Sequence, residues 1–168
     1  VLIFGIGPIG ILHAMLAKLY GASAIYCIDI NQNKVDFCKK INLGICINGL
    51  TSEIDNLVKL NDQLRPDLII IATSDMSVLG KSLDIIRKGG TILLFGEPQK
   101  EVDVNVDLGK LYSKEVKIIT TYAATNKEIN QALQMITKLE IDVNKLITHR
   151  YSIADSKDAF EKVHGKND

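Results

Sequence analysis

The sequence carries no excess of charge of either sign. Twenty Lys and Arg residues balance twenty Asp and Glu residues, which gives a formal net charge of zero at pH 7. Proteins that bind nucleic acid usually show a basic excess or a stripe of Lys and Arg, so no nucleic-acid partner is expected. With 46% apolar and 24% charged residues, the 168-residue chain has the composition of one globular domain.

The sequence also lacks long apolar runs, and it has too few cysteines to pair them all. No run approaches the roughly 20 residues that a membrane helix needs, and no signal peptide precedes the first expected strand, so no membrane partner is expected. The cysteines Cys27, Cys38 and Cys46 are an odd number, which favours free thiols and a cytoplasmic location. The chain opens directly on a strand-like run at residues 1–4, as a piece of a longer protein would.

Short apolar segments alternate with segments of helical spacing along the chain. Those expected to be strands are rich in Ile and Val and apolar on both faces, as in a parallel sheet covered on both sides. They comprise residues 1–4, 24–28, 45–47, 67–72, 91–95 and 116–120. The expected helices comprise residues 9–20, 32–42, 53–61, 75–88 and 127–138. The alternation predicts an α/β fold with a doubly wound parallel sheet, the Rossmann fold, and helices on both faces.

Residues 101–107 do not fit this alternation. Polar and apolar side chains take turns there, which predicts a further, half-buried strand near an edge of the sheet. Its valines, Val102, Val104 and Val106, would offer an apolar face to a two-fold partner. We therefore expect a homodimer, or a tetramer built from it, that involves residues 92–121.

The motif GIGPIG lies between an expected strand and an expected helix, where the dinucleotide fingerprint is found. Gly5 permits a tight turn, Gly7 lets the backbone approach a pyrophosphate, and Gly10 lets the helix pack close to the sheet. The N–H groups of Ile9 and Gly10 would face the phosphates at the positive end of the helix dipole. Pro8 suits the first helical position, because its missing N–H costs nothing there.

Asp29 ends the second expected strand, at the distance from the glycine motif where an acidic residue accepts the ribose hydroxyls of NAD. A 2′-phosphate placed there would meet a like charge, so we expect NAD rather than NADP. Lys34, one helical turn further on, is a candidate for contact with the adenosine. The plainer interpretation makes Asp29 a solvated strand end and Lys34 a solvated helix residue.

Two further pairs of residues follow expected strands. Thr73 and Ser74 come after the fourth strand, and Gly96 and Glu97 come after the fifth. Ligands of open α/β sheets bind outside the carboxyl ends of the strands, so these residues are expected to line the cofactor cleft. Capping of the next helix is the alternative role for Ser74.

The sequence offers no recognisable catalytic set. No Ser–His–Asp group, paired carboxylates or Tyr-x-x-x-Lys arrangement has a usable spacing. Cys38 and Cys46 flank a helix end without a CxxC motif or a His at ligand spacing, so no zinc site is expected. His13 is more simply a half-buried histidine than a catalytic one. We assign no catalytic residue and no metal ligand in this chain.

The sequence resembles the medium-chain, zinc-dependent alcohol and polyol dehydrogenases nearly from end to end. Residues 1–29 look like the first strand–helix–strand unit of that family, and KGGTI at 88–92, before Gly96, is similar to its fifth-strand signature. LITHRY at 146–151, followed by DAFE at 158–161, resembles its late tail.

The resemblance implies a cofactor-binding fragment of an enzyme that transfers a hydride from an alcohol or a sorbitol-like polyol to NAD. Gly5, Gly7 and Gly10 would hold the pyrophosphate, Asp29 the adenosine ribose, and Lys34 would lie beside it. The catalytic zinc belongs to an N-terminal domain in the family, so this chain alone should oxidise no alcohol and hold no stoichiometric zinc.

The resemblance also implies two parts in this chain. Residues 1–143 would form the NAD-binding domain, and residues 144–168 a tail that returns to the catalytic domain in the family. A helix is expected at 156–164 in this tail. Since its packing partner is missing, we expect the tail to be ordered less firmly than the sheet.

Two other classes of protein remain open. A nucleotide-sensing regulatory domain would use the same glycines and the same acidic residue without catalysis, and the dehydrogenase-like tail argues against it. A methyltransferase also has a glycine-rich loop and an acidic residue after its second strand. It would normally carry a denser GxGxG motif than this sequence has.

Overall fold

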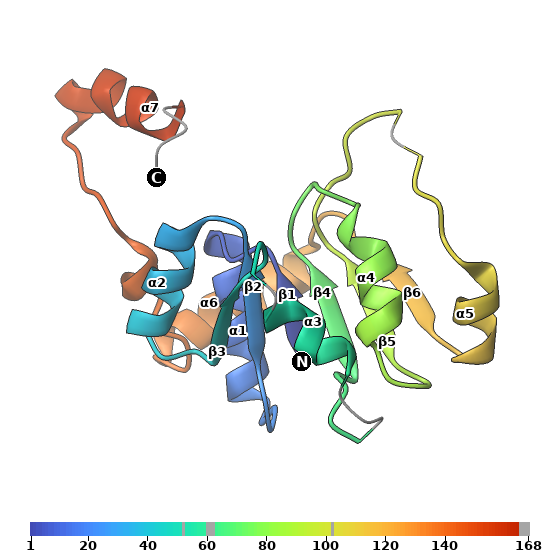
Figure 1. Cartoon of the computed structure of the whole chain (residues 1–168). Coiled ribbons are helices and arrows are strands. Elements are labelled where there is room, and N and C mark those ends of the chain that lie inside the picture. The colour runs from blue at the N-terminus through green and yellow to red at the C-terminus, as the bar shows by residue number, and fades with distance from the viewer. Residues whose placement is uncertain (52, 60–62, 102, 165–168) are drawn as a thin grey trace.

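A computed structural model describes residues 1–51, 53–59, 63–101 and 103–164 of the chain. Six strands form one parallel sheet in the order β3-β2-β1-β4-β5-β6 (Figure 1). The strands are β1 (Leu2–Phe4), β2 (Tyr26–Asp29), β3 (Ile45–Asn48), β4 (Leu68–Ile71), β5 (Thr91–Leu94) and β6 (Lys117–Thr120). The chain reverses direction across the sheet between β3 and β4, which is the arrangement of a doubly wound α/β fold. The predicted fold class is confirmed.

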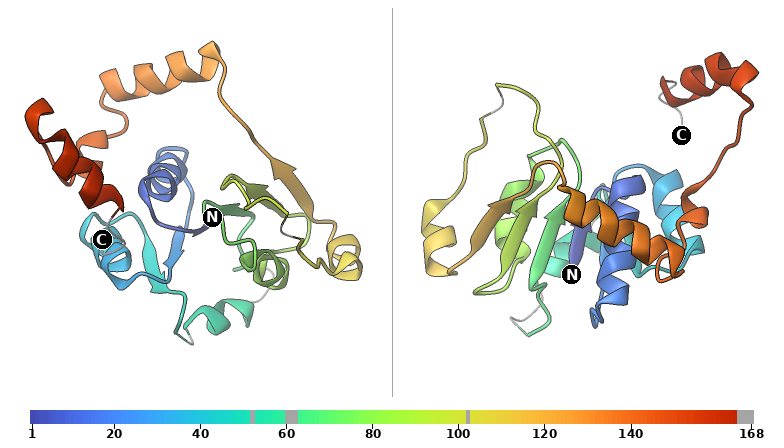
Figure 2. Two further views of the ribbon diagram at one scale, coloured as in Figure 1. Left: turned by 90° about the horizontal axis from the view of Figure 1, so that it is seen from above. Right: turned by 180° about the vertical axis from the view of Figure 1, so that it is seen from behind.

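Five helices lie between the strands in the chain and two follow β6, and helices cover both faces of the sheet (Figure 2). They are α1 (Pro8–Leu19), α2 (Gln32–Lys40), α3 (Glu53–Val58), α4 (Val78–Ile85), α5 (Leu108–Ser113), α6 (Asn126–Thr137) and α7 (Ser156–His164). Two short 3₁₀ helices, η1 (Val143–Leu146) and η2 (Ile153–Asp155), lie in the tail. Within the described part of the chain, none of the helices is long and apolar enough to cross a bilayer.

The strands send alternate side chains into two separate cores. Phe4 packs in one core with Ile54 of α3 and Leu79 of α4. Ile3 packs in the other with Ala14 of α1 and with residues of α2. Because both faces of every central strand are buried, the strands read as continuous apolar runs in the sequence.

The expected strand at 101–107 is wrong. Residues 101 and 103–107 form no ladder, and Val102 lies outside the described residues. Val104 and Val106 pack against the core on the α4 side of the sheet, so their apolar face is used within the chain. The neighbouring position on β5 is already taken, because β6 pairs with it along its whole length. Helix α5, which follows, was not predicted.

The tail begins against the sheet domain and then leaves it. Val143 and Leu146 of η1 pack against the core beside α1 and α2. Further on, Ile153 is 94% exposed and Phe160 of α7 is 67% exposed, and α7 stands apart from the sheet (Figure 1). The helix expected at 156–164 is present, but none of the apolar side chains described in it is buried.

Candidate cofactor-binding site

Two glycines of the motif are required by close approaches of the backbone. Gly5 has a φ of +87°, and a Cβ on it would lie 2.8 Å from the carbonyl oxygen of Ala72. A Cβ on Gly10 would lie 1.8 Å from the carbonyl oxygen of Gly5. The turn after β1 is therefore pressed between β4 and α1, and any side chain at either position would push it out.

Gly7 has a different surrounding. Nothing in the described part of the chain lies within 4 Å of a Cβ placed on it, so its lack of a side chain leaves open space before α1. Pro8 occupies the first turn of the helix, as predicted. The N–H groups of Ile9 and Gly10 have no intrahelical acceptor in this position, and the helix dipole favours an anion there.

Asp29 ties the glycine turn to the end of β2. Its Oδ2 accepts a hydrogen bond from the Ile6 N–H and its Oδ1 accepts one from the Asn31 N–H, both at 2.9 Å. The side chain is only 9% exposed, and the Lys34 Nζ lies 3.9 Å from Oδ2. A carboxylate offers about four lone-pair sites, so acceptors remain for a ligand. Asp29 is thus a structural link as well as a candidate ribose acceptor, and the interpretation as a solvated strand end is wrong.

Lys34 is placed by the start of α2. The Asn31 Oδ1 caps this helix by accepting hydrogen bonds from the N–H groups of Asn33 at 2.9 Å and Lys34 at 3.4 Å. Lys34 then borders a cavity of about 420 Å³ together with Gly7, Pro8 and the tail residue His149. The sequence did not predict His149 at this place; its motif in the tail was the only signal.

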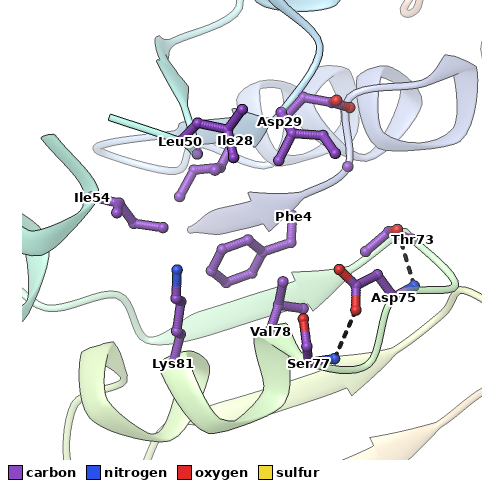
Figure 3. Close-up of a pocket in the computed structure, with 13 residues that line it drawn as sticks. Phe4, Ile28, Asp29, Leu50, Ile54, Thr73, Asp75, Ser77, Val78 and Lys81 are labelled. Atoms are coloured by element: carbon purple, nitrogen blue, oxygen red, sulfur yellow. Dashed lines mark hydrogen bonds between the residues drawn. The ribbon is translucent and has the colours of Figure 1, made fainter. Parts of the chain in front are cut away.

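A second cavity of about 360 Å³ lies outside the carboxyl ends of β1, β2 and β4, and we term it the strand-end cavity. Its walls are mostly apolar, and Asp29 and Lys81 lie at opposite ends of it (Figure 3). The lining comprises Phe4, Gly5, Ile28, Asp29, Ile30, Gly49, Leu50, Ile54, Thr73, Asp75, Ser77, Val78 and Lys81. Lys81 was not predicted, because only the packing of α4 against β4 and α3 brings it here.

The structure separates the residues expected at the ends of β4 and β5. Thr73 reaches the strand-end cavity, where its Oγ1 accepts a hydrogen bond from the Asp75 N–H at 3.2 Å (Figure 3). A Cβ on Gly96 would lie 2.2 Å from the carbonyl oxygen of Thr73, so this glycine packs the two strand ends together. Ser74 borders another cavity and does not cap α4, which begins after Ser77. Glu97 is exposed.

His13 is half-buried on α1, as expected from the sequence. Its ring meets the ring of Phe95 edge to face, with centroids 4.5 Å apart. Burial lowers the pKa of His13 below 6.5, because the charged imidazolium loses its hydration there.

The three cysteines come together, contrary to the argument from their spacing. Cys27 and Cys46 are register partners in neighbouring strands β2 and β3, and Cys38 of α2 covers the same face. Their Sγ atoms all lie within 4.8 Å of one another. The spacing of the cysteines in the sequence did not predict this cluster, because strand register and the helix between the two strands bring them together. As whole residues, Cys27, Cys38 and Cys46 are 0%, 0% and 6% exposed, so an alcohol could not reach a zinc ion there, and a catalytic zinc does not fit.

Comparisons with known proteins identify relatives over nearly the whole chain. A family model described as zinc-binding dehydrogenase matches residues 8–138. Sorbitol dehydrogenase of Bombyx mori is 31% identical over 96% of this chain and 47% of its own length. L-threonine 3-dehydrogenase of Aliivibrio fischeri is 28% identical over 97% of this chain and 47% of its own length. The chain therefore spans about half the length of these relatives.

Solved structures agree on the fold. An alcohol dehydrogenase from Escherichia coli CFT073, solved with its cofactor NADH, superposes with a TM-score of 0.86. The match covers 99% of this chain and 48% of that chain at 23% identity.

Proposed function

The chain belongs to the zinc-binding dehydrogenase family, and from this premise we propose that it binds NAD as the cofactor-binding part of an alcohol or polyol dehydrogenase. NAD, when bound, supplies the acceptor for a hydride from the substrate. Residues outside the present chain would hold the zinc and relay the proton. A sorbitol-like polyol is the substrate class we favour, because the 31% identical relative is a sorbitol dehydrogenase.

The observation that carries this proposal is the link between Asp29 and the glycine turn. The hydrogen bond from the Ile6 N–H to the Asp29 carboxylate holds an acidic acceptor beside the open space at Gly7. A dinucleotide needs both features, an acceptor for its ribose hydroxyls and exposed N–H groups for its pyrophosphate.

The remaining site residues follow from this placement. Gly5, Gly7 and Pro8 would lie beside the pyrophosphate. The N–H groups of Ile9 and Gly10 would point toward it. Lys34 would lie beside the adenosine ribose. The apolar strand-end cavity, which Thr73 borders, would receive the adenine.

Further along the sheet, the ends of β4 and β5 would border the nicotinamide half of the cofactor. Ser74, Gly96 and Glu97 are the residues concerned. Gly96 supports this placement, because its lack of a side chain is what lets the end of β5 approach Thr73.

The test is cofactor selectivity, measured by calorimetric titration of NAD and NADP. Wild-type protein should bind NAD roughly tenfold to a hundredfold more tightly than NADP. NADP would lose the two hydrogen bonds from the ribose hydroxyls to the Asp29 carboxylate, and its 2′-phosphate would be repelled by the same negative charge. Asp29→Asn should weaken NAD binding and narrow the gap between the two cofactors. Circular dichroism of this variant should check that it still folds. The Asn amide has one acceptor oxygen, so it cannot accept hydrogen bonds at two separate atoms from the Ile6 and Asn31 N–H groups, as the carboxylate does.

Asp36→Asn is the matched control. Asp36 is exposed on α2 and accepts a hydrogen bond from the Gln32 Nε2 at 2.8 Å, so this variant removes the same charge nearby without touching the turn. Its cofactor affinities should equal those of the wild type. Equal affinity of the wild type for NAD and NADP would contradict the ribose assignment, and binding of S-adenosylmethionine in place of NAD would indicate a methyltransferase.

A further inference from the structure

The three cysteines form a compact cluster that the proposed function does not use. Cys27 of β2, Cys38 of α2 and Cys46 of β3 come from three different elements, and each points into the core between α2 and the sheet. The Sγ atoms of Cys38 and Cys46 are 2.6 Å apart, and all three lie within 4.8 Å of one another. All are free thiols. One atom could bond to all three once the Cys38 and Cys46 sulfurs move apart, because two sulfurs bonded to the same atom lie farther apart than 2.6 Å.

We propose that this cluster is a binding site for the trivalent oxyacid of arsenic, arsenite, held by three sulfur atoms. The site is independent of the proposed dinucleotide site, which lies at the carboxyl ends of the strands. It is also distinct from a catalytic zinc site, because no substrate can reach it.

Charge is the reason for choosing a trivalent oxyacid over a divalent cation. The other buried members of this core cluster are all apolar, among them Ile3, Ile25, Val35 and Ile70. A divalent cation with three thiolates leaves one net negative charge in this apolar core, which is costly. Trivalent arsenic with three thiolates is neutral. The apolar surroundings therefore favour arsenic over zinc.

The reaction with arsenite balances without any oxidant or base. Three S–H bonds and three As–OH bonds break, three As–S bonds form, and each thiol proton leaves with a hydroxide as one water molecule. Arsenic stays trivalent throughout. Entry is simplest beside Cys46, which is the least buried of the three and lies on the edge strand β3. Opening of the α2–β3 contact would admit the small neutral acid.

The experiment uses the whole chain, reduced with a phosphine and freed of small thiols, and sodium arsenite as the probe. Native mass spectrometry should show one adduct per chain whose mass equals one arsenic minus three hydrogens. Arsenite should also raise Tm by about 5 °C or more, because the folded cluster presents three thiols together and the unfolded chain does not. Zinc chloride at the same concentration should give neither effect.

Cys38→Ala should weaken arsenite binding by about a hundredfold or more, since loss of even an outer contact costs a metal site about 10–100-fold. Val35→Ala is the matched control. Val35 lies on the same helix and is fully buried in the same core, so its loss disturbs the packing but leaves the thiols. This variant should be destabilised yet still bind one arsenite.

Three results would overturn the proposal. Binding of arsenite that is unchanged in Cys38→Ala would show that two thiols suffice. Zinc binding tighter than arsenite and lost in Cys38→Ala would make the cluster a divalent-cation site. A Cys38–Cys46 disulfide that persists after phosphine treatment, found by mass spectrometry, would make it a structural disulfide.

Discussion

Gly7 and Gly10 lie three positions apart, but only Gly7 has space for a side chain. The backbone leaves no space for a side chain at Gly10, since a Cβ would lie 1.8 Å from the Gly5 carbonyl oxygen. Gly10→Ala should therefore destabilise the fold by about 2 kcal/mol and lower Tm by about 4–8 °C, as overpacking of a rigid backbone contact does. NAD binding should fall with it, because the turn must shift. Thermal denaturation and calorimetry measure the two effects.

Gly7→Ala should weaken NAD binding without lowering the stability of the fold. No described atom lies within 4 Å of the added Cβ, so Tm should change by less than about 2 °C. The methyl group would occupy the open space before α1, so NAD binding should weaken by at least about tenfold. Unchanged NAD affinity in Gly7→Ala would place the pyrophosphate elsewhere.

His13 should make the stability of the protein depend on pH. Its pKa is lowered from 6.5 in the folded state by burial, so the unfolded chain binds the proton first as the pH falls. Stability is therefore lost below about pH 6.5 and is fully present above it. His13→Leu removes this proton uptake, and urea denaturation at about pH 7 and about pH 5 should show a smaller loss for the variant. An equal loss in both proteins would exclude His13 as a cause.

At the level of elements, the sequence predicts what local patterns determine. Helix α1 and the turn before it follow from the glycine motif, Pro8 and the adjacent apolar run, because the sterics of each act within a few residues. The place of Asp29 at the end of β2 also follows from the local pattern, but its hydrogen bond to the Ile6 N–H joins residues 23 positions apart and does not. The expected strand at 101–107 was wrong because its valines pack on a core surface that only the complete sheet creates. Lys81 and the cysteine cluster were missed because strand register and helix packing bring distant residues together.

The tail contains the element with the weakest support. Helix α7 has nine residues, a length that is marginal for an isolated helix in water, and its Phe160 and Val163 are 67% and 80% exposed. Strand β4, in contrast, is flanked by β1 and β5. Hydrogen exchange of the α7 amides should be at least about a thousandfold faster than that of β4.

The start of the tail provides the internal comparison for this measurement. Leu146 packs against the core, so the amides of η1 should exchange at an intermediate rate. Exchange as slow in α7 as in β4 would show that the tail docks on the domain or on a neighbouring molecule, and the expectation of weaker order would fail.

In the sheet formed by the described residues, β3 and β6 are the two edge strands. Unpaired backbone groups at an edge can pair with a second copy of the chain. We favour β6 as the dimer edge, because this strand and the segments next to it in the chain carry exposed apolar side chains: Ile119 of β6 is 47% exposed, Tyr112 of α5 86% and Tyr122 after β6 88%. The dimer would thus still involve residues 92–121, but through β6 and not through the valines near residue 104.

Two matched substitutions test which edge forms the dimer. Ile119→Lys places a charge on the β6 edge, and it should convert a dimer to a monomer in light scattering at micromolar concentration, because two like charges would meet across the two-fold axis. Ile45→Lys places the same charge on β3, where Ile45 is 53% exposed, and this variant should remain dimeric. Both side chains are exposed at edges, so neither change should lower Tm of the isolated chain by more than about 2 °C. A monomeric wild type would refute assembly through this edge, and a dimer broken by Ile45→Lys alone would move the interface to β3.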